Sequence, residues 1–240
     1  MPADAYVYEG SDLLRLGEQL KNYNAATADL IVEHIGPGDR VLDFGAGFGT
    51  LTKAVAARTK QPQCVEPDRQ QRERLIRDGF HCFDSIESVE SHAYDVVYSS
   101  NVLEHIEDDV RALKEIHRVL TPGGKVVLYL PAFQSLYTAL DRAIGHYRRY
   151  DIKMIETRLR EAGFETKQSF YVDVLGYPVS KLFKAISDDV STVNTRTIRI
   201  YDSVVFPISR LIEKFVRPPF GKNVLAFAVS AKNPEIRASG

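Results

Sequence analysis

Short apolar runs alternate with helical patterns along most of the chain. Between the runs, apolar residues recur at spacings of about three and four, the pattern of a helix that buries one face. This alternation is typical of a mostly parallel β-sheet with helices on both faces. The pattern predicts an α/β fold with seven strands. The expected strands are residues 40–44, 63–66, 81–83, 94–99, 125–130, 166–174 and 223–231.

Two further segments have helical patterns outside this alternation. Residues 1–38 are expected to form an N-terminal helical segment. Residues 175–221 carry two amphipathic stripes, which predict a helical cap over the open end of the sheet. Pro207 lies in the second stripe and is expected to kink or restart its helix, because proline has no backbone N–H. The expected organisation is one domain over residues 1–240, with its core in 39–174 and 222–232 and with segments 132–151 and 175–221 beside that core.

Composition and charge exclude several classes of protein. Lys and Arg total 31 against 32 Asp and Glu, so the formal net charge is −1 and no global field attracts nucleic acid or an anionic membrane. Cys64 and Cys82 cannot form a disulfide framework, and their spacing is not that of a metal site. The chain begins without a signal-peptide pattern, and no apolar run approaches the roughly 18 residues of a membrane span. We therefore expect a cytoplasmic protein with no nucleic-acid partner, no integral membrane association and no metal.

A glycine-rich turn follows the first predicted strand. Gly45 and Gly47 lack Cβ atoms where the backbone must turn sharply and approach a ligand. The turn departs from the dinucleotide-binding pattern G-x-G-x-x-G, because Thr50 stands where the last glycine would be. Asp43 lies directly before the turn, where a carboxylate would repel a pyrophosphate and attract a cationic ligand.

A second acidic residue, Glu66, ends the next predicted strand, 66 − 47 = 19 residues after Gly47. A carboxylate at this position can accept hydrogen bonds from both hydroxyls of a ribose, whereas it would repel a 2′-phosphate. Taken singly, Asp43 could be a turn or helix cap and Glu66 a solvated carboxylate at a strand end. Together with the glycines, the two carboxylates predict a site for a nucleoside without phosphates.

A wider set of motifs resembles the class I S-adenosylmethionine-dependent methyltransferases over roughly residues 20–175 and the last strand. The motifs are VLDFGAGFGT, CVEPD, FDSIESV, DVVYSSNVLEHIEDD and LKEIHRVLTPGGKVVLYLP. The resemblance implies a Rossmann-like fold, S-adenosyl-L-methionine as cofactor and methyl transfer as the reaction. The implied cofactor-binding residues are Asp43, Gly45, Ala46 and Gly47 at the methionine part, Glu66 and Pro67 at the ribose, Asp84, Ser85 and Ile86 at the adenine, and Asn101 near the sulfonium.

Two histidines are candidate general bases for methyl transfer. His105 follows the fourth predicted strand, and His146 lies in the segment HYRRY after the fifth. A base contributes roughly 10²–10⁴-fold when the acceptor must lose a proton, although methyl transfer to some acceptors needs only placement. His105 could equally open the next helix and fill space.

The segment at residues 132–151 is expected to cross the mouth of the site. HYRRY resembles a segment in one branch of these methyltransferases, which often act on small molecules, sugars or lipid-linked precursors. The expected substrate contacts are Arg148, Arg149 and Tyr150 from this segment and Tyr177 from the cap. The alternative is that the arginines tie the loop to helix ends and to Asp141.

The reaction predicted from the sequence is methyl transfer to oxygen or nitrogen of a small organic acceptor, such as a secondary metabolite, a sugar or a lipid precursor. Basic residues on the cap also allow peripheral contact with a membrane surface. The chain is expected to be a monomer or a homodimer. The alternatives are a binding module that holds S-adenosylmethionine without turnover, and a nicotinamide-dependent oxidoreductase.

Overall fold

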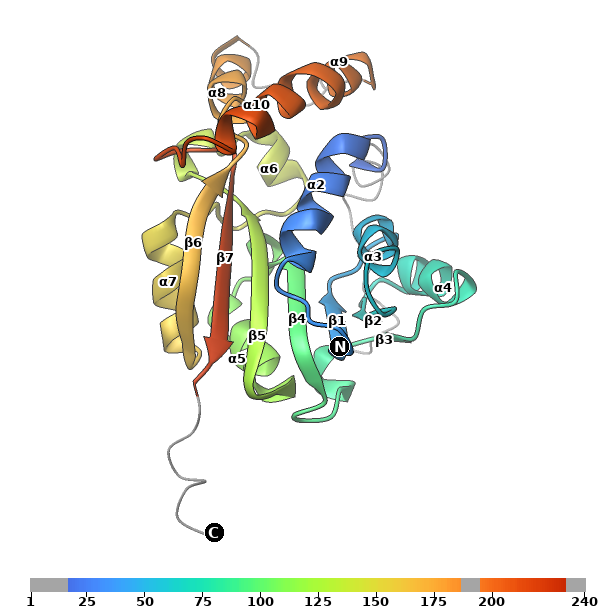
Figure 1. Ribbon diagram of the computed structural model, residues 1–240. Coiled ribbons are helices and arrows are strands. Elements are labelled where there is room, and N and C mark those ends of the chain that lie inside the picture. The colour runs from blue at the N-terminus through green and yellow to red at the C-terminus, as the bar shows by residue number, and fades with distance from the viewer. Residues whose placement is uncertain (1–16, 187–194, 232–240) are drawn as a thin grey trace.

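Seven strands form one mixed β-sheet in the computed structural model, which describes residues 17–186 and 195–231. The strands are β1 (Val41–Phe44), β2 (Gln63–Val65), β3 (Cys82–Phe83), β4 (Tyr94–Ser100), β5 (Leu120–Pro131), β6 (Phe164–Val172) and β7 (Asn223–Ser230). Their order is β3-β2-β1-β4-β5-β7-β6, and β7 alone is antiparallel to its neighbours. The predicted seven-stranded α/β fold is therefore confirmed (Figure 1).

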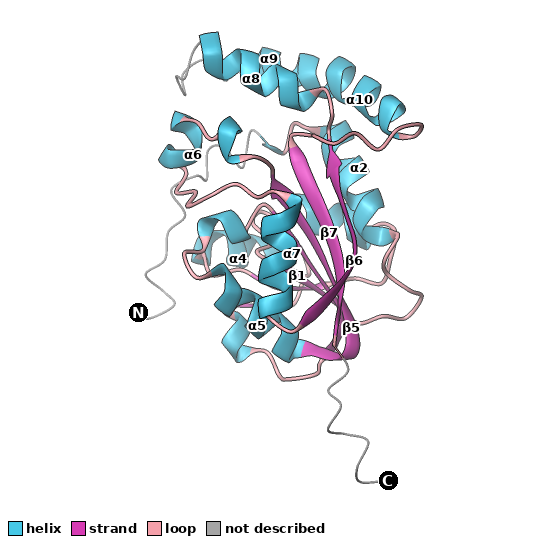
Figure 2. Ribbon diagram, turned by 90° about the vertical axis from the view of Figure 1, so that its left-hand side faces the viewer, coloured by secondary structure: helices cyan, strands magenta, loops and turns pink. Residues whose placement is uncertain are grey.

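Helices cover both faces of the sheet, which gives three layers (Figure 2). On β1, Val41 packs toward α2 (Lys21–Val32) and α3 (Thr50–Ala56), while its neighbour Leu42 packs toward α5 (Asp109–Val119) and α7 (Ile152–Glu161). This alternation follows from the two-residue period of a strand. Helix α4 (Arg69–Arg77) packs through Leu75 on the same face as α2 and α3, against the buried Cys64 of β2. The strands are buried on both faces, which explains why the sequence reads as short continuous apolar runs.

Acidic residues fix the starts of three helices. The side chains of Asp68, Asp108 and Asp151 each accept a hydrogen bond from the backbone N–H three residues later, at the first turns of α4, α5 and α7. Such caps satisfy N–H groups that the helix itself leaves unpaired. Each of these helices begins one residue after its capping aspartate. A cap is a local sequence pattern, so these helix starts can be predicted from the sequence.

The strand expected at residues 125–130 begins earlier in the structure, because β5 starts at Leu120 directly after α5 and includes residues 122–124. The pairing with β4 shifts register between Tyr94 and Val96, so the glycines lie in an irregular start of the strand. Gly123 has φ +80°, and a Cβ on Gly124 would lie 2.8 Å from the Thr121 carbonyl oxygen. The two glycines therefore bend the start of the strand. They do not form a separate turn between α5 and the strand.

The insertion between β6 and β7 forms the predicted cap of helices (Figures 1 and 2). It consists of α8 (Gly176–Ile186), α9 (Thr195–Ile200), a π-helical turn (Tyr201–Val205) and α10 (Phe206–Glu213). Pro207 lies in the first turn of α10, directly after the π-helical turn. Val205 and Phe206 keep α-helical dihedral angles, so the helix changes type at this proline and does not restart after a break. These helices lie across the carboxyl ends of the parallel strands.

The cap is tied to the N-terminal helix through the buried Asp202. Its carboxylate accepts hydrogen bonds from the backbone N–H groups of Asn22 and Tyr23, at 3.0 and 2.9 Å. No side chain of α2 itself caps this helix, so a residue 180 positions away supplies the missing acceptor. Helix α2 is shorter than the predicted N-terminal segment, of which residues 1–16 lie outside the described residues.

Apolar side chains of the cap face solvent. Leu182, Ile186, Leu211 and Phe215 are 55–82% exposed. Within the described residues, no helix is long and apolar enough to cross a bilayer.

Candidate active site

A cavity of about 420 Å³ opens at the carboxyl ends of β1, β2 and β4. Its walls come from the glycine turn after β1, the end of β2, the residues after β4, the end of β5, the loop after α6 (Ala139–Ala143), helix α2 and the start of β7. The strand order reverses between β1 and β4, and ligands of open α/β sheets bind at such a switch point. The volume lies in the range of small-molecule sites.

The glycine turn forms one end of this cavity. Gly45, Gly47 and Gly49 have φ values of +84°, +56° and +79°, a region that residues with a Cβ rarely adopt. A Cβ on Gly45 would lie 2.4 Å from a methyl carbon of Val102. Conformation and space therefore both require glycine at Gly45, whose backbone N–H donates to the Val65 carbonyl oxygen at 2.9 Å.

Asp43 lies beneath the turn with 2% of its surface exposed. One carboxylate oxygen, Oδ2, accepts hydrogen bonds from Thr52 Oγ1 at 2.6 Å and from the Tyr98 hydroxyl at 2.8 Å. Burial raises the pKa of Asp43 to about 6, although both hydrogen bonds oppose the shift. Thr52 and Tyr98 were not predicted as site residues, because nothing in their own positions indicates that they support a carboxylate.

Glu66 closes the same end of the cavity. Its two oxygens accept hydrogen bonds from the backbone N–H groups of Gly47 at 2.7 Å and Asp68 at 2.9 Å. Burial raises the pKa of Glu66 to about 7, against the effect of these hydrogen bonds. A carboxylate oxygen has two lone pairs, so each oxygen can still accept a hydrogen bond from a ligand hydroxyl.

The other predicted cofactor residues divide into two groups. Ala46, Pro67 and Asn101 line the cavity. Asn101 has φ +54°, a strained value that recurs at functional sites and that asparagine tolerates. The remaining three do not line it. Asp84 accepts a hydrogen bond from Ser88, Ser85 also contacts Ser88, and Ile86 is buried in the core. Their predicted contact with adenine stays a prediction.

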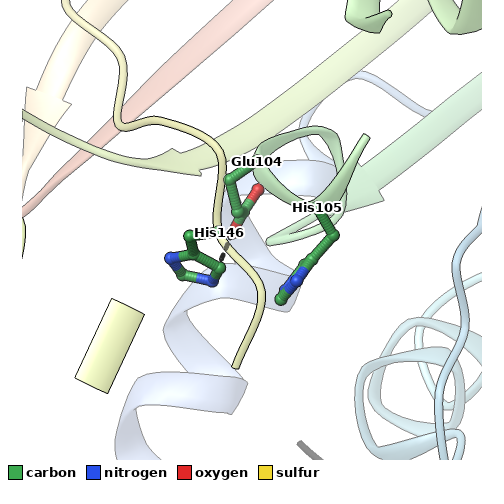
Figure 3. A group of neighbouring side chains, drawn as sticks. All are labelled: Glu104, His105 and His146. Atoms are coloured by element: carbon green, nitrogen blue, oxygen red, sulfur yellow. Dashed lines mark ion pairs between the residues drawn. The ribbon is translucent and has the colours of Figure 1, made fainter. Parts of the chain in front are cut away.

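Glu104, His105 and His146 also line the cavity and form a cluster (Figure 3). Glu104 and His105 come from a short 3₁₀ turn (Leu103–His105) after β4, and His146 follows helix α6 (Ala139–Ala143). The backbone N–H of Tyr147 donates to the Glu104 carbonyl oxygen at 2.7 Å, which brings the two segments together. Residues distant in the sequence thus face one another.

Asp141 orients the ring of His146. The Asp141 carboxylate hydrogen-bonds Nδ1 of His146 at 2.7 Å and accepts two hydrogen bonds from Arg149, both at 2.9 Å. Burial alone would raise the pKa of Asp141, but the hydrogen bonds from His146 and Arg149 outweigh burial and hold this pKa well below its usual range. An ionised Asp141 makes Nδ1 the protonated nitrogen, so Nε2 carries the lone pair.

Glu104 is fully buried and faces His146, with 3.9 Å between its Oε1 and Nε2 of His146. Among the described residues, no other residue donates a hydrogen bond to either oxygen of Glu104. Burial raises the pKa of Glu104 to about 8, because its own backbone N–H and the charge of Arg149 compensate only in part. Burial and the neighbouring His146 lower the pKa of His105 to about 4. The two imidazole rings pack edge to face, with their centroids 4.4 Å apart.

Three of the four predicted substrate contacts do not line the cavity. Arg148 donates to the carbonyl oxygens of Ile106 and Glu107 and pairs with Asp109, to which the buried Tyr150 also donates. Tyr177 packs among aromatic rings. Arg149 does line the cavity, although its guanidinium is paired with Asp141. These contacts tie the loop to neighbouring elements, the alternative that the sequence left open, and substrate binding by these residues stays a prediction.

Several residues that line the cavity could not be predicted as site residues from the sequence. Tyr23 and Asn24 come from helix α2, and Lys222 and Asn223 from the start of β7. Burial lowers the pKa of Lys222, although the carboxylate of Asp173 opposes the shift. No described residue of 175–221 lines this cavity, so contact between the cap and an acceptor stays a prediction. Only the three-dimensional arrangement brings these positions to the site.

The residues of the glycine-turn end suit S-adenosylmethionine. The turn leaves no space for side chains at Gly45, and two buried carboxylates flank it with lone pairs for hydroxyl and ammonium donors. No phosphate-binding cation lines this end, among the cavity residues that the structure describes at the turn and at β2. A positively charged nucleoside without phosphates therefore fits this chemistry.

Comparison with known proteins agrees with the site. Residues 16–169 match the family described as a methyltransferase domain, which is more than half of the chain. The chain therefore belongs to this family. It is an S-adenosylmethionine-dependent methyltransferase, and its cofactor is S-adenosyl-L-methionine.

Curated relatives are distant. A ubiquinone biosynthesis O-methyltransferase of Pseudomonas aeruginosa is 27% identical over 70% of this chain and 82% of its own length. A dimethylglycine N-methyltransferase of Parasynechococcus marenigrum is 28% identical over 57% of this chain and 66% of its own. An uncharacterised 37.1 kDa protein in transposon TN4556 of Streptomyces fradiae is 25% identical over 92% of this chain and 70% of its own.

Solved structures share the fold. A Haloferax volcanii chain from a complex with the Trm112 methyltransferase activator has a TM-score of 0.65, with 14% identity over 95% of this chain and 99% of its own. The 1,6-didemethyltoxoflavin-N1-methyltransferase of Burkholderia thailandensis, solved with 1,6-didemethyltoxoflavin and S-adenosylhomocysteine, has a TM-score of 0.58. It is 16% identical over 88% of this chain and 79% of its own.

Proposed function

We propose that this methyltransferase acts on oxygen or nitrogen of a small organic acceptor, which binds beside Glu104, His105 and His146. One observation carries the proposal: a single cavity is lined both by the carboxylate-flanked glycine turn and by the cluster of Glu104, His105 and His146. A donor and an acceptor in one dry cavity react with effective molarities of about 10⁵–10⁸ M when they are aligned.

The glycine-turn end would hold the cofactor. Glu66 would accept hydrogen bonds from the ribose hydroxyls, and Asp43 and the backbone of Gly45 and Gly47 would face the methionine part. Asn101 would lie near the sulfonium, since it lines the same cavity. When bound, S-adenosylmethionine supplies an electrophilic methyl group on a sulfonium.

The cluster of Glu104, His105 and His146 would prepare the acceptor. Asp141 fixes the ring of His146 through Nδ1, and Nε2, 3.9 Å from Glu104, would receive a proton from an acceptor or hold an acceptor group. His105 stands beside it with a pKa lowered to about 4, so its ring is neutral at physiological pH. The prediction that one of these histidines is the base remains open at this point.

The nature of the acceptor is supported by three features. Two curated relatives are named for methylation of dimethylglycine and for ubiquinone biosynthesis, and the toxoflavin enzyme is named for a small heterocycle. The cavity has the size of a small-molecule site. The exposed apolar residues of the cap, with nearby Lys181 and Lys214, would also suit a lipid precursor at a membrane surface.

A thermal-shift and turnover experiment tests the proposal. S-adenosylhomocysteine should stabilise the protein, since a ligand at 100 times its Kd adds about 2.7 kcal/mol. NADH should not. Methyl transfer should follow with at least one amine or hydroxyl compound from a broad acceptor panel. Binding without transfer to any acceptor would favour the non-catalytic module.

Stabilisation by NADH alone would favour the oxidoreductase. Tyr177 and Lys181 have the Tyr-x-x-x-Lys spacing of some nicotinamide enzymes, but neither lines the cavity, and Lys181 lies over the Tyr177 ring. This pair of residues therefore gives the oxidoreductase alternative no support.

A further inference from the structure

We propose that Glu104, His105 and His146 bind one divalent transition-metal cation, which holds the oxygen of the acceptor. This inference deepens the proposed function and rests on it for the use of the cation, whereas the binding itself rests on the three side chains. It differs from the expectation of no metal that the sequence alone supported.

The charge of Glu104 is the first argument. Other buried carboxylates around the cavity have donors of their own: Asp43 has two hydroxyls, Glu66 two backbone N–H groups and Asp141 a guanidinium. Among the described residues, no other residue offers Glu104 a donor within hydrogen-bond distance, although it is fully buried. A buried carboxylate without a partner is strongly destabilising. A cation in the cavity would provide the missing partner.

The geometry is the second argument. One ligand atom from each of the three residues lies within 4.8 Å of the other two, and Oε1 of Glu104 is 3.9 Å from Nε2 of His146. Two ligands that are each about 2.1 Å from a cation can be at most about 4.2 Å apart. The Glu104–His146 pair already meets this limit, and a closure of about half an ångström by the third side chain completes the set.

The surroundings of the ligands are the third argument. Metal-binding histidines commonly donate their second N–H to a carboxylate or a backbone carbonyl. His146 donates Nδ1–H to Asp141, which Arg149 keeps ionised, and the His105 ring is hydrogen-bonded to the backbone of Ile144. Both imidazoles are therefore held in place by groups outside the cluster. The pair of Asp141 and His146 has the arrangement of a carboxylate–histidine–metal triad.

The ligand set indicates the class of metal. Two imidazoles and one carboxylate suit zinc, manganese, iron or cobalt in the divalent state, rather than magnesium or calcium, which prefer oxygen ligands. All three residues line the cavity, so the remaining coordination positions face the space left for the acceptor. Methyl transfer changes no oxidation state, so the cation would act as a Lewis acid.

The cation would change how the acceptor loses its proton. An oxygen bound to a divalent cation has a much lower pKa, as metal-bound water does. An acceptor hydroxyl would release its proton to solvent and keep its oxygen, now an anion, on the cation. His105 and His146 would then be ligands rather than bases, which decides between the roles that the sequence left open for them.

Metal binding is tested first without turnover. Chelator-treated protein is titrated with Zn²⁺ or Mn²⁺ in a calorimeter, and with Co²⁺ while its visible absorption is recorded. We expect one ion per chain and a Co²⁺ spectrum typical of nitrogen and oxygen ligands. The variants Glu104→Gln and His146→Gln should weaken binding on the order of 100-fold or more.

Matched controls separate this site from surface binding. Glu107→Gln and His81→Gln change an exposed carboxylate and an exposed imidazole outside the cavity, and should bind the ions as the wild type does. Thermal denaturation and affinity for S-adenosylhomocysteine show whether Glu104→Gln and His146→Gln remain folded. The proposal is overturned if wild type and folded cluster variants bind the same number of ions with the same affinity.

Turnover distinguishes failure of this inference from failure of the proposed function. With an acceptor found in the panel, the chelated enzyme should lose most of its activity and regain it with Zn²⁺ or Mn²⁺. Full activity after chelation would overturn the catalytic use of the cation and leave the proposed function standing. Protein that binds the ion but neither S-adenosylhomocysteine nor any acceptor would contradict the proposed function alone.

Discussion

The two parts of the cavity differ in the hydrogen-bond donors that they offer to a buried carboxylate. At the glycine turn, Glu66 accepts hydrogen bonds from two backbone N–H groups, one at each carboxylate oxygen. In the other part, Glu104 is more deeply buried and no other residue among those described donates to it. Both carboxylates have raised pKa values, about 7 for Glu66 and about 8 for Glu104, and burial is the main cause of each.

The chain itself supplies the hydrogen-bond donors of Glu66, whereas Glu104 needs a partner from outside the chain. Backbone donors from the turn hold the carboxylate of Glu66 in position for a ligand that adds hydrogen bonds. Glu104 is aimed at His146, and its charge remains uncompensated until a proton or a cation arrives. We expect changes in the first part to affect cofactor affinity and changes in the second to affect turnover.

The largest expected effect is on turnover. His146→Ala removes Nε2 from the acceptor end, so kcat should fall by about 10²–10⁴-fold, the range of groups that act on the proton of an acceptor. The Kd for S-adenosylmethionine should stay the same, because His146 lies away from the glycine turn. Steady-state kinetics and calorimetry measure both, with His81→Ala as the control. Wild-type turnover in His146→Ala would mean that the segment at residues 132–151 has only a structural role.

The pH dependence of stability sharpens the comparison at Glu104. The pKa of Glu104 rises from 4.5 to about 8 on folding, so the metal-free folded chain binds more protons than the unfolded chain between these values. Its contribution to stability is therefore lost as pH rises through that window. Glu104→Gln should stabilise the chelated protein at pH 8 by a few kcal/mol relative to wild type, and by little at pH 4.5.

Urea denaturation across this pH range measures the difference. Asp43 and Glu66 also have raised pKa values, but they are present in both proteins and cancel in the comparison. A stability difference between variant and wild type that does not change with pH would mean that Glu104 is already compensated in the folded chain.

The packing of the glycine turn predicts the next effect. Gly45→Ala should destabilise the fold by about 2–4 kcal/mol, because the new Cβ meets Val102 in a backbone conformation that disfavours it. Gly38 has a similar φ of +88° with nothing within 4 Å of its Cβ position, so Gly38→Ala isolates the backbone strain. Equal losses of stability in the two variants would show that Val102 moves aside without cost.

The smallest of these effects is on cofactor binding. Glu66→Ala should weaken affinity for S-adenosylmethionine by about 1–3 kcal/mol, the scale of hydrogen bonds to a charged group. That corresponds to about 5- to 150-fold in Kd. Turnover at saturating cofactor should change much less. Glu87→Ala, at an exposed carboxylate near β3, is the matched control, and an unchanged Kd in Glu66→Ala would remove the ribose assignment.

Local patterns account for what the sequence could predict. The strands are buried on both faces, and aspartates cap α4, α5 and α7, so elements and their order follow from short segments of sequence. The glycine turn and Glu66 likewise lie at adjacent strand ends, because parallel neighbours bring their carboxyl ends together.

Long-range contacts account for what the sequence could not predict. Asp202 caps α2 from 180 residues away, and Asn223 reaches the cavity because β7 inserts between β5 and β6 in the opposite direction. Arg148 and Arg149 are adjacent in the sequence, yet one pairs with Asp109 and the other with Asp141 at the cavity. Spacing cannot distinguish two such arginines, since only the folded loop decides where each one points.

A crystal structure of the protein with S-adenosylhomocysteine tests the central claim most directly, namely that cofactor and acceptor occupy opposite ends of one cavity. The ribose should lie against Glu66, and the sulfur should point along Asn101 toward Glu104 and His146. A cofactor bound elsewhere, or with its sulfur directed away from the histidine cluster, would contradict the account.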